Sequence, residues 1–221
     1  MKNRININDY EGIIFDLDGT LVDSMWVWDY VDEEFLKKRN IKEPEDYKEV
    51  IMPMGIEKVA DYTIKRFNLN ENSDDIINEW LDLSYEAYKD KVKLNNGAYD
   101  FIKSLFKSGK KMSVATANDK ELAKMCLENN KVYKYFNNIT TVNEVERGKG
   151  FPDIYKKAAD KMNINYDKCL VFEDIKEGIT GSIKGGFTTV AVLCNITDES
   201  KKEEIKKISK YYIDDFSLLY V

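Results

Sequence analysis

Five short runs of β-branched and other apolar residues recur along the chain, and each ends in polar or small residues. They cover residues 12–15, 112–115, 139–142, 169–172 and 188–193. Continuous apolar runs of this length are typical of strands buried on both faces of a parallel sheet. This pattern constrains the fold strongly, because parallel strands can only be joined by long crossover connections.

Segments with the helical spacing of apolar residues lie between these runs. They cover residues 98–106, 121–128, 154–162 and 175–183. A chain that alternates strands with helices forms a parallel sheet with helices on both faces. The sequence therefore predicts a Rossmann-like α/β fold, in which ligands bind outside the carboxyl ends of the strands.

The stretch from residue 21 to residue 96 interrupts this alternation. It contains only helix-like patterns, at residues 27–39, 45–51, 56–67 and 74–91. It is acidic, with 18 Asp/Glu against 11 Lys/Arg, and an Asn-Asn-Gly turn signal closes it. We predict an α/β core domain of residues 1–20 and 97–221, with a helical domain inserted at residues 21–96.

The chain has no histidine, which excludes several kinds of chemistry. Ser-His-Asp triads, Cys-His pairs and histidine zinc sites all need an imidazole. Cys126, Cys169 and Cys194 are isolated and form no C-x-x-C pair, which favours small buried thiols in a reducing compartment over a disulfide or metal framework. Acid–base chemistry must therefore use carboxylates, lysine, tyrosine or cysteine.

Charge and hydropathy limit the partners that we expect. The formal net charge is −6, and the dense basic stretch at residues 201–210 alternates lysine with glutamate, as an exposed helix face does. No apolar run approaches the roughly 18 residues that span a bilayer, and the first ten residues lack the apolar stretch of a signal peptide. We expect a cytoplasmic protein that binds neither nucleic acid nor membranes, and the sequence indicates no particular oligomeric state.

The first predicted strand runs directly into Asp16-Leu17-Asp18-Gly19-Thr20. Side chains two residues apart in an extended chain share a side, so Asp16 and Asp18 can face one small pocket, and Gly19 permits a sharp turn. Two neighbouring carboxylates repel each other, and a hard divalent cation bound through oxygen can remove this repulsion. The motif therefore indicates a metal site at the strand end.

Polar groups also follow other predicted strands or precede the next helix. Residues 116–118 read Thr-Ala-Asn and offer a hydroxyl and amide N–H groups just before a helix, where anions are favoured. Lys149 lies between two glycines, and Glu173 and Asp174 follow the fourth strand. Each feature has an ordinary explanation alone, as a helix cap or a solvated charge. Together they place carboxylates, a hydroxyl and an ammonium group on one rim of the sheet.

Four segments, in this order, resemble the motifs of haloacid-dehalogenase-type phosphohydrolases with a helical cap after the first motif: FDLDGTLVDS, VATAN, GKGFPDIY and FEDIKEGITGSIKGG. Two positions depart from the family pattern. Gly150 stands where proline usually follows the lysine, and Ile175 stands where serine usually follows the acidic pair. The resemblance implies a phosphatase that uses Mg²⁺ to hydrolyse a small-molecule phosphate monoester through an aspartyl-phosphate.

The resemblance also implies a role for each acidic residue of these motifs. Asp16 would be the nucleophile, and Asp18 would protonate the leaving oxygen and later activate water. Mg²⁺ would be held by Asp16, the backbone carbonyl of Asp18 and Asp174. Glu173 would be a further metal partner, directly or through water.

The same resemblance assigns residues to the phosphoryl group and to the rest of the substrate. Lys149 would offset its negative charge, and Thr116 with the amides of Ala117 and Asn118 would hold its oxygens.

The helical insert would cover the site and choose the substrate. There Trp28, near Trp26, and Lys58 are candidate substrate contacts, while packing within the insert and plain solvation are the competing interpretations.

Each alternative function would require a feature that this sequence lacks, or would lack a feature that it has. A mutase resembling the β-phosphoglucomutases would carry a cap histidine soon after the first motif, and this chain has none. A receiver-type phosphate switch lacks both an acid at the position of Asp18 and a large insert, and a dehalogenase usually lacks that second aspartate. No G-x-G-x-x-G follows the first strand, which disfavours a dinucleotide oxidoreductase. The phosphatase is the preferred reading, with the mutase as the first alternative.

Overall fold

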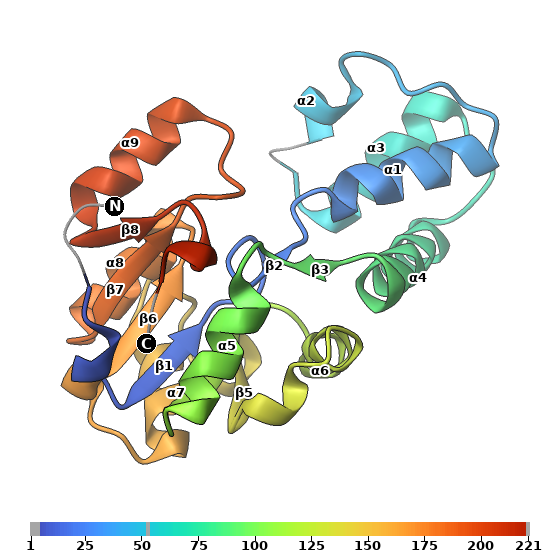
Figure 1. The fold of residues 1–221 in the computed structure, drawn as a ribbon. Coiled ribbons are helices and arrows are strands. Elements are labelled where there is room, and N and C mark those ends of the chain that lie inside the picture. Colours follow the sequence, from blue (N-terminus) through green and yellow to red (C-terminus); the bar gives the residue numbers. More distant parts are fainter. Residues whose placement is uncertain (1–4, 52–53, 220–221) are drawn as a thin grey trace. The chain divides into compact units, whose positions relative to one another are not determined.

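The computed structural model describes residues 5–51 and 54–219 (Figure 1). The chain divides into two compact units, one formed by Met1–Met25 with Val92–Val221 and the other by Trp26–Lys91. The strand-end residues singled out above all belong to the larger unit.

Six strands form the main sheet of the larger unit, in the order β5-β4-β1-β6-β7-β8, and every neighbouring pair is parallel. The strands are β1 (Gly12–Phe15), β4 (Lys111–Thr116), β5 (Asn138–Thr141), β6 (Cys169–Glu173), β7 (Thr188–Val192) and β8 (Tyr211–Ile213). The five predicted strands are confirmed. The sixth, β8, was not predicted, because its three residues at the sheet edge are too few to form an apolar run.

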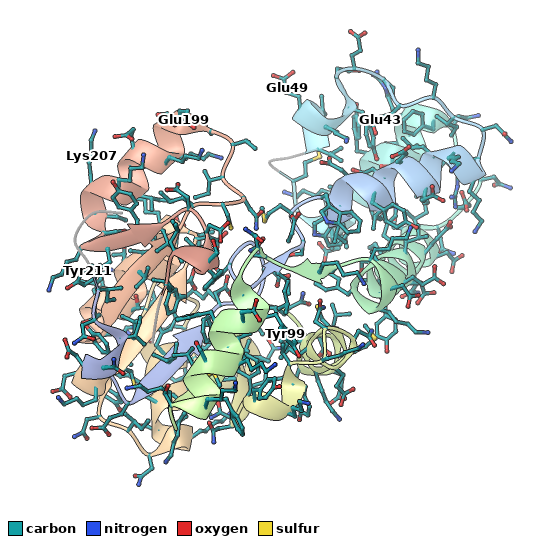
Figure 2. All side chains as sticks on the ribbon, viewed as in Figure 1. Glu43, Glu49, Tyr99, Glu199, Lys207 and Tyr211 are labelled. Atoms are coloured by element: carbon teal, nitrogen blue, oxygen red, sulfur yellow. The ribbon has the colours of Figure 1, made fainter. Side chains whose placement is uncertain are left out.

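Helices cover both faces of this sheet, as the alternating pattern predicted. They are α5 (Ala98–Lys107), α6 (Lys120–Asn129), α7 (Asp153–Met162), α8 (Lys176–Lys184) and α9 (Glu199–Ile208). The stretch at residues 201–210 is confirmed as an exposed face, since most of α9 is solvated and its labelled Glu199 and Lys207 project outward in Figure 2. Among the described residues, no helix has both the length and the apolar character needed to cross a membrane.

Strand β1 lies between β4 and β6 and is buried on both faces. On one face, Phe15 stacks on Phe172 with ring centroids 5.0 Å apart and meets the edge of Phe101 of α5 at 6.3 Å. On the other face, Ile14 belongs to an apolar cluster with Tyr155 and other residues of α7. Because both faces are packed, the residue that follows β1 has a fixed position at the centre of the sheet.

The smaller unit is helical. It contains α1 (Val27–Lys38), α2 (Tyr47–Ile51), α3 (Ile56–Phe67) and α4 (Ser73–Asp90), which confirms the four predicted helices. Phe35 packs against Trp80 with ring centroids 5.3 Å apart, and the buried hydroxyls of Tyr47 and Thr63 lie 2.7 Å apart. The unit therefore has a core of its own.

Two short strands stand where the chain leaves the larger unit and returns to it. They are β2 (Val22–Asp23) and β3 (Lys93–Leu94), which pair antiparallel with Asp23 opposite Lys93. Residues 21–25 and 92–96, which the sequence analysis placed in the insert, lie in the larger unit.

Candidate active site

The residue that follows β1 is held in place by the strand ladder. The backbone N–H of Asp16 donates to the carbonyl of Phe172 at 2.9 Å, so its backbone continues the pairing of β1 with β6. The chain then turns at Gly19, where φ is 75°, and the N–H of Gly19 donates to the carbonyl of Val22 at 3.0 Å. This turn keeps the carboxylate of Asp16 at the end of the central strand, where it is almost completely buried.

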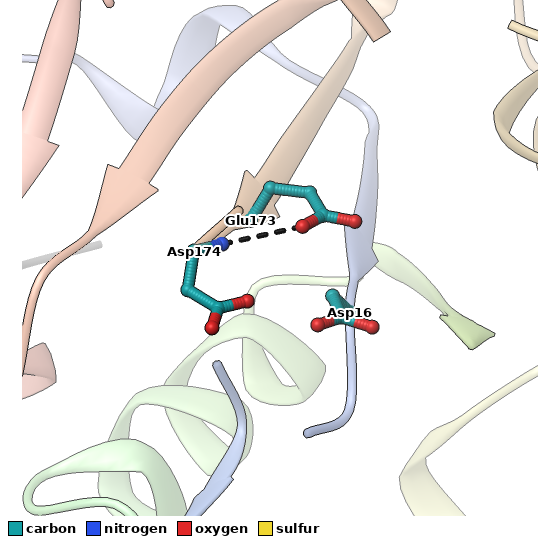
Figure 3. A group of neighbouring side chains, drawn as sticks. All are labelled: Asp16, Glu173 and Asp174. Atoms are coloured by element: carbon teal, nitrogen blue, oxygen red, sulfur yellow. Dashed lines mark hydrogen bonds between the residues drawn. The ribbon is translucent and has the colours of Figure 1, made fainter. Parts of the chain in front are cut away.

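Three buried carboxyl groups converge at this point, those of Asp16, Glu173 and Asp174 (Figure 3). Each offers an oxygen atom, and these oxygens all lie within 4.8 Å of one another. Asp174 is oriented by Thr20, whose hydroxyl donates to Oδ1 at 2.9 Å. Oxygen donors at this spacing suit a hard divalent cation such as Mg²⁺, which would remove the repulsion between the carboxylates.

Lys149 supplies a positive charge inside this acidic cluster. Its ammonium group is buried and pairs with the carboxylate of Asp16 and, at 2.8 Å, with Oε1 of Glu173. The backbone of the Lys149 loop approaches α8 so closely that a Cβ at Gly181 would collide with the carbonyl oxygen of Lys149. The lysine thus reaches Asp16 although Gly150 replaces the proline of the family pattern.

Glu173 uses both of its carboxylate oxygens in hydrogen bonds. Oε1 accepts from Lys149 and, at 2.7 Å, from the hydroxyl of Tyr155. Oε2 accepts from the backbone N–H of Asp174 at 3.2 Å, the contact dashed in Figure 3. A Cβ at Gly178 of α8 would collide with this carboxylate, so α8 covers it closely. Glu173 therefore belongs to the acidic cluster and also holds the lysine.

The carboxylate of Asp18 has hydrogen-bond donors that differ from those of Asp16. Its Oδ1 accepts from the hydroxyl of Ser24 at 2.8 Å, and its Oδ2 accepts from the side-chain amide of Asn118 at 3.3 Å. Among the described residues, the acidic cluster that could hold a metal does not include the carboxylate of Asp18. That carboxylate is half-buried and is oriented by the two donors, which suits a group that exchanges protons.

The segment after β4 differs in detail from the expected anion site. Thr116 is fully buried, and its Oγ1 accepts from the backbone N–H of Asn118 at 2.9 Å. Ala117 is exposed, and Asp119 caps α6 by accepting from the N–H groups of Glu121 and Leu122. The N–H of Asn118, which the sequence analysis assigned to a phosphoryl oxygen, is thus bonded within its own turn.

Burial shifts the pKa values of the charged groups in the cluster. It raises the pKa of Asp16 well above its ordinary value, against the opposing effect of Lys149 and with the support of Glu173 and Asp174. Burial, assisted by Glu173, raises the pKa of Asp174 to about 6. Burial would lower the pKa of Lys149, but the adjacent Asp16 and Glu173 outweigh it and keep the ammonium group charged. In the absence of a cation, burial and mutual repulsion therefore disfavour the ionised forms of Asp16 and Asp174, and a bound cation would favour them.

The candidate substrate contacts of the insert lie in the smaller unit. The side chain of Trp28 is 54% exposed, so it is not part of that unit's core. Trp26 is half-buried with its ring 5.8 Å from that of Tyr30, and Lys58 is exposed in the first turn of α3. Ile175, at the family's serine position, is exposed and precedes α8 without a side-chain cap.

Three residues outside the predicted set orient the site. Thr20 and Ser24 bind the carboxylates of Asp174 and Asp18, and Tyr155 binds Glu173. Thr20 and Ser24 lie within the FDLDGTLVDS segment, so their closeness to the aspartates was a usable signal. Tyr155 ends the GKGFPDIY segment, but it also occupies an apolar position of α7, and its hydrogen bond to Glu173 was not predicted.

Comparisons with known proteins agree with this arrangement. A model of the haloacid dehalogenase-like hydrolase family matches residues 13–192. The pyrophosphatase PpaX of Bacillus cereus is 24% identical over 196 residues, which cover 88% of each chain. A Thermotoga maritima structure assigned as a β-phosphoglucomutase superposes with a TM-score of 0.84 at 20% identity, covering 95% of this chain and 96% of the other. A family IA hydrolase structure from Entamoeba histolytica gives a TM-score of 0.74 at 22% identity, with 96% of each chain covered.

Proposed function

The chain belongs to the haloacid dehalogenase-like hydrolase family, and we propose that it is a Mg²⁺-dependent phosphatase. Its substrate would be a small-molecule phosphate monoester, and its intermediate an aspartyl-phosphate on Asp16. The observation that carries this proposal is the buried Asp16 at the end of the central strand, in contact with Lys149 and beside Asp174. A nucleophilic carboxylate needs positive charge around it before it can approach an anionic ester.

The first half of the reaction forms the phosphoenzyme. A carboxylate oxygen of Asp16 attacks phosphorus, the bond from phosphorus to the ester oxygen breaks, and that oxygen takes a proton from Asp18. Ser24 and Asn118 hold the carboxyl group of Asp18 for this transfer. The ammonium group of Lys149 offsets the charge of the phosphoryl oxygens.

The second half returns the enzyme to its starting state. Asp18, now ionised, takes a proton from water while the water oxygen attacks phosphorus. The bond from phosphorus to Asp16 breaks, and inorganic phosphate leaves. Mg²⁺, held by Asp16, Asp174 and the backbone carbonyl of Asp18, would supply further positive charge beside the phosphoryl group. The oxygen donors of the acidic cluster fit such an ion.

The smaller unit would select the substrate and limit access of water. Trp28 is our first candidate for a substrate contact there, because an aromatic side chain that is exposed rather than packed in a core is free to bind a ligand. Lys58 is the second candidate, for an additional anionic group of the substrate.

A β-phosphoglucomutase-like activity is the alternative function. The resemblance in fold to the Thermotoga structure supports it, while the lack of histidine opposes it. The receiver-type phosphate switch is the least favoured hypothesis, because the chain matches a family of hydrolases.

The experiment that tests the proposal is a substrate panel assayed for inorganic phosphate with Mg²⁺. The panel contains phosphoglycolate, hexose phosphates, nucleoside monophosphates and, because of the similarity to PpaX, pyrophosphate. We expect at least one monoester to be turned over, and we expect EDTA to abolish that activity. Release of phosphate that persists in EDTA, or activity restricted to pyrophosphate, would contradict the proposal.

A further inference from the structure

Tyr155 joins the apolar interior of the larger unit to the acidic cluster. The residue is fully buried in α7, and its ring lies 6.2 Å from that of Phe187 in a cluster that includes Ile14 and Val171. Its hydroxyl extends beyond these apolar neighbours and donates a hydrogen bond to Oε1 of Glu173 at 2.7 Å. A buried tyrosine hydroxyl needs a partner, and here that partner is a carboxylate of the candidate active site.

The same carboxylate oxygen also binds Lys149. Nζ of Lys149 lies 2.8 Å from Oε1 of Glu173 and also contacts Asp16. A lysine side chain has four rotatable bonds and a compact charge, so the direction of its ammonium group depends on its acceptors. The position of the ammonium group beside Asp16 therefore depends on where the carboxylate of Glu173 is held.

Three donors hold that carboxylate: the hydroxyl of Tyr155, the ammonium group of Lys149 and the N–H of Asp174. Of these, only the Tyr155 hydroxyl is a side-chain donor that does not itself contact Asp16 or belong to the carboxylate cluster. Its loss would leave Oε1 of Glu173 with Lys149 as its remaining donor, and the carboxylate could then rotate together with the lysine.

We propose that Tyr155 is a positioning residue of this active site, which fixes Glu173 so that Glu173 directs Lys149 toward Asp16. The role in catalysis rests on the proposed phosphatase function. The geometric part, the control of Lys149 by Tyr155, does not depend on it.

The test compares Tyr155→Phe with Tyr166→Phe. The ring of Tyr166 packs on the same Phe187, at 5.3 Å, but its hydroxyl donates to Asp160 at 2.9 Å, away from the cluster. Both rings pack against the same apolar cluster, but the hydroxyl of Tyr155 is buried and that of Tyr166 forms an exposed hydrogen bond. We expect Tyr155→Phe to lower kcat about tenfold with KM changed less than about twofold, and Tyr166→Phe to change neither.

A second readout follows Lys149 without any assay of activity. In protein labelled with ¹⁵N-lysine, the Nζ signal of Lys149 is identified by its loss in Lys149→Arg. We expect Tyr155→Phe to shift this signal and to speed its proton exchange with water, and Tyr166→Phe to leave it unchanged. Glu173→Gln, which keeps the size of the side chain, should shift it in the same way.

The two readouts separate the two proposals. Should the wild-type protein hydrolyse none of the esters, the proposed function fails, and the Lys149 signal still decides whether Tyr155 positions the lysine. An unchanged Lys149 signal in folded Tyr155→Phe protein overturns the inference whatever the activity. A shifted signal with unchanged kcat overturns its catalytic part.

Discussion

Gly19 lies so close to Asp174 that a Cβ at position 19 would collide with the carboxylate oxygen Oδ2 of that aspartate. The two residues come from different strand ends, one just after β1 and the other just after β6. Gly19 also has a φ of 75°, which side chains disfavour. The glycine of the first motif therefore makes room for Asp174 of the last motif, the aspartate that we propose as a metal ligand.

A comparison of Gly19→Ala with Gly109→Ala should separate the effect of the clash with Asp174 from that of backbone strain. Gly109 has a similar φ of 73° but no atom within 4 Å of the position that a Cβ would take, so Gly109→Ala measures the strain alone. We expect the backbone strain to cost about 1 kcal/mol in the free energy of unfolding in each variant, and the clash with Asp174 to add to this cost in Gly19→Ala. Only Gly19→Ala should also displace Asp174 and abolish the stabilisation by Mg²⁺ in thermal unfolding. A Gly19→Ala protein with wild-type stabilisation by Mg²⁺ would refute this account.

Asp16→Asn should form no phosphoenzyme. The amide is a poor nucleophile, so we expect kcat to fall by roughly 10³-fold or more. The measurement is single-turnover labelling with a ³²P-phosphate ester, followed by acid quenching. Mass spectrometry must first exclude deamidation back to aspartate. Near-normal turnover in the verified Asp16→Asn protein would show that another residue is the nucleophile.

Asp18→Asn should be sensitive to the leaving group of the substrate. Loss of the general acid should slow an alkyl phosphate by roughly 10²–10⁴-fold. It should slow p-nitrophenyl phosphate less, because that leaving group needs little protonation. The aspartyl-phosphate should also accumulate, since no base activates water. Equal losses for both substrates would mean that Asp18 does not act as the acid.

The stabilising effect of Mg²⁺ should depend on pH. Burial raises the pKa of Asp174 from 3.8 to about 6, so its charged form is disfavoured in the folded protein. For this group alone, the metal-free protein loses stability as pH rises from about 4 to 6. Mg²⁺ binds the ionised carboxylates and should restore this stability.

The measurement is thermal unfolding at pH 5 and pH 7.5, with EDTA or with saturating Mg²⁺. At one hundred times its Kd, Mg²⁺ should add about 2.7 kcal/mol at pH 7.5. At pH 5 the same concentration should add less, because protons compete for Asp174. Asp174→Asn serves as the control. It should remove most of the difference between pH 5 and pH 7.5 in the stabilisation by Mg²⁺. An equal effect at both pH values in the wild type would contradict the prediction.

Hydrolase and mutase activities can be separated with one substrate. A mutase must protect its phosphoenzyme from water until the sugar returns, and this chain lacks the cap histidine of the mutases that it resembles. We expect β-glucose 1-phosphate, with a trace of glucose 1,6-bisphosphate, to yield inorganic phosphate or no product. Glucose 6-phosphate in large excess over phosphate would establish the mutase instead.

Much of the fold could be predicted from the sequence, because a buried parallel strand and an amphipathic helix leave local signals. Strand β1 reads as four apolar or small residues before Asp16, and the limits predicted for α3 match the observed helix. The antiparallel pair β2 and β3 could not be seen, since two-residue strands carry no periodicity.

Part of the candidate site could also be predicted from the sequence, and part of it could not. Asp16, Lys149 and Asp174 could be expected to meet, because the ends of parallel strands share one rim. The contacts of the side chains that orient these three residues depend on distances in the folded structure, which the spacing of residues along the sequence does not reveal. Tyr155 ends the GKGFPDIY segment but has the spacing of a helix core position, and only the folded structure shows that its hydroxyl reaches Glu173.

The pairing of β2 with β3 has a consequence for how such a protein can change over generations. Asp23 and Lys93 are opposed in an antiparallel pair, so the two points where the helical unit is joined to the core are no farther apart than the ends of a hairpin turn. Segments of very different length can bridge such a gap, since the entropy cost of closing a loop grows only slowly with its length. The helical unit can thus be exchanged, enlarged or trimmed as a module while the chemistry of the larger unit is inherited intact.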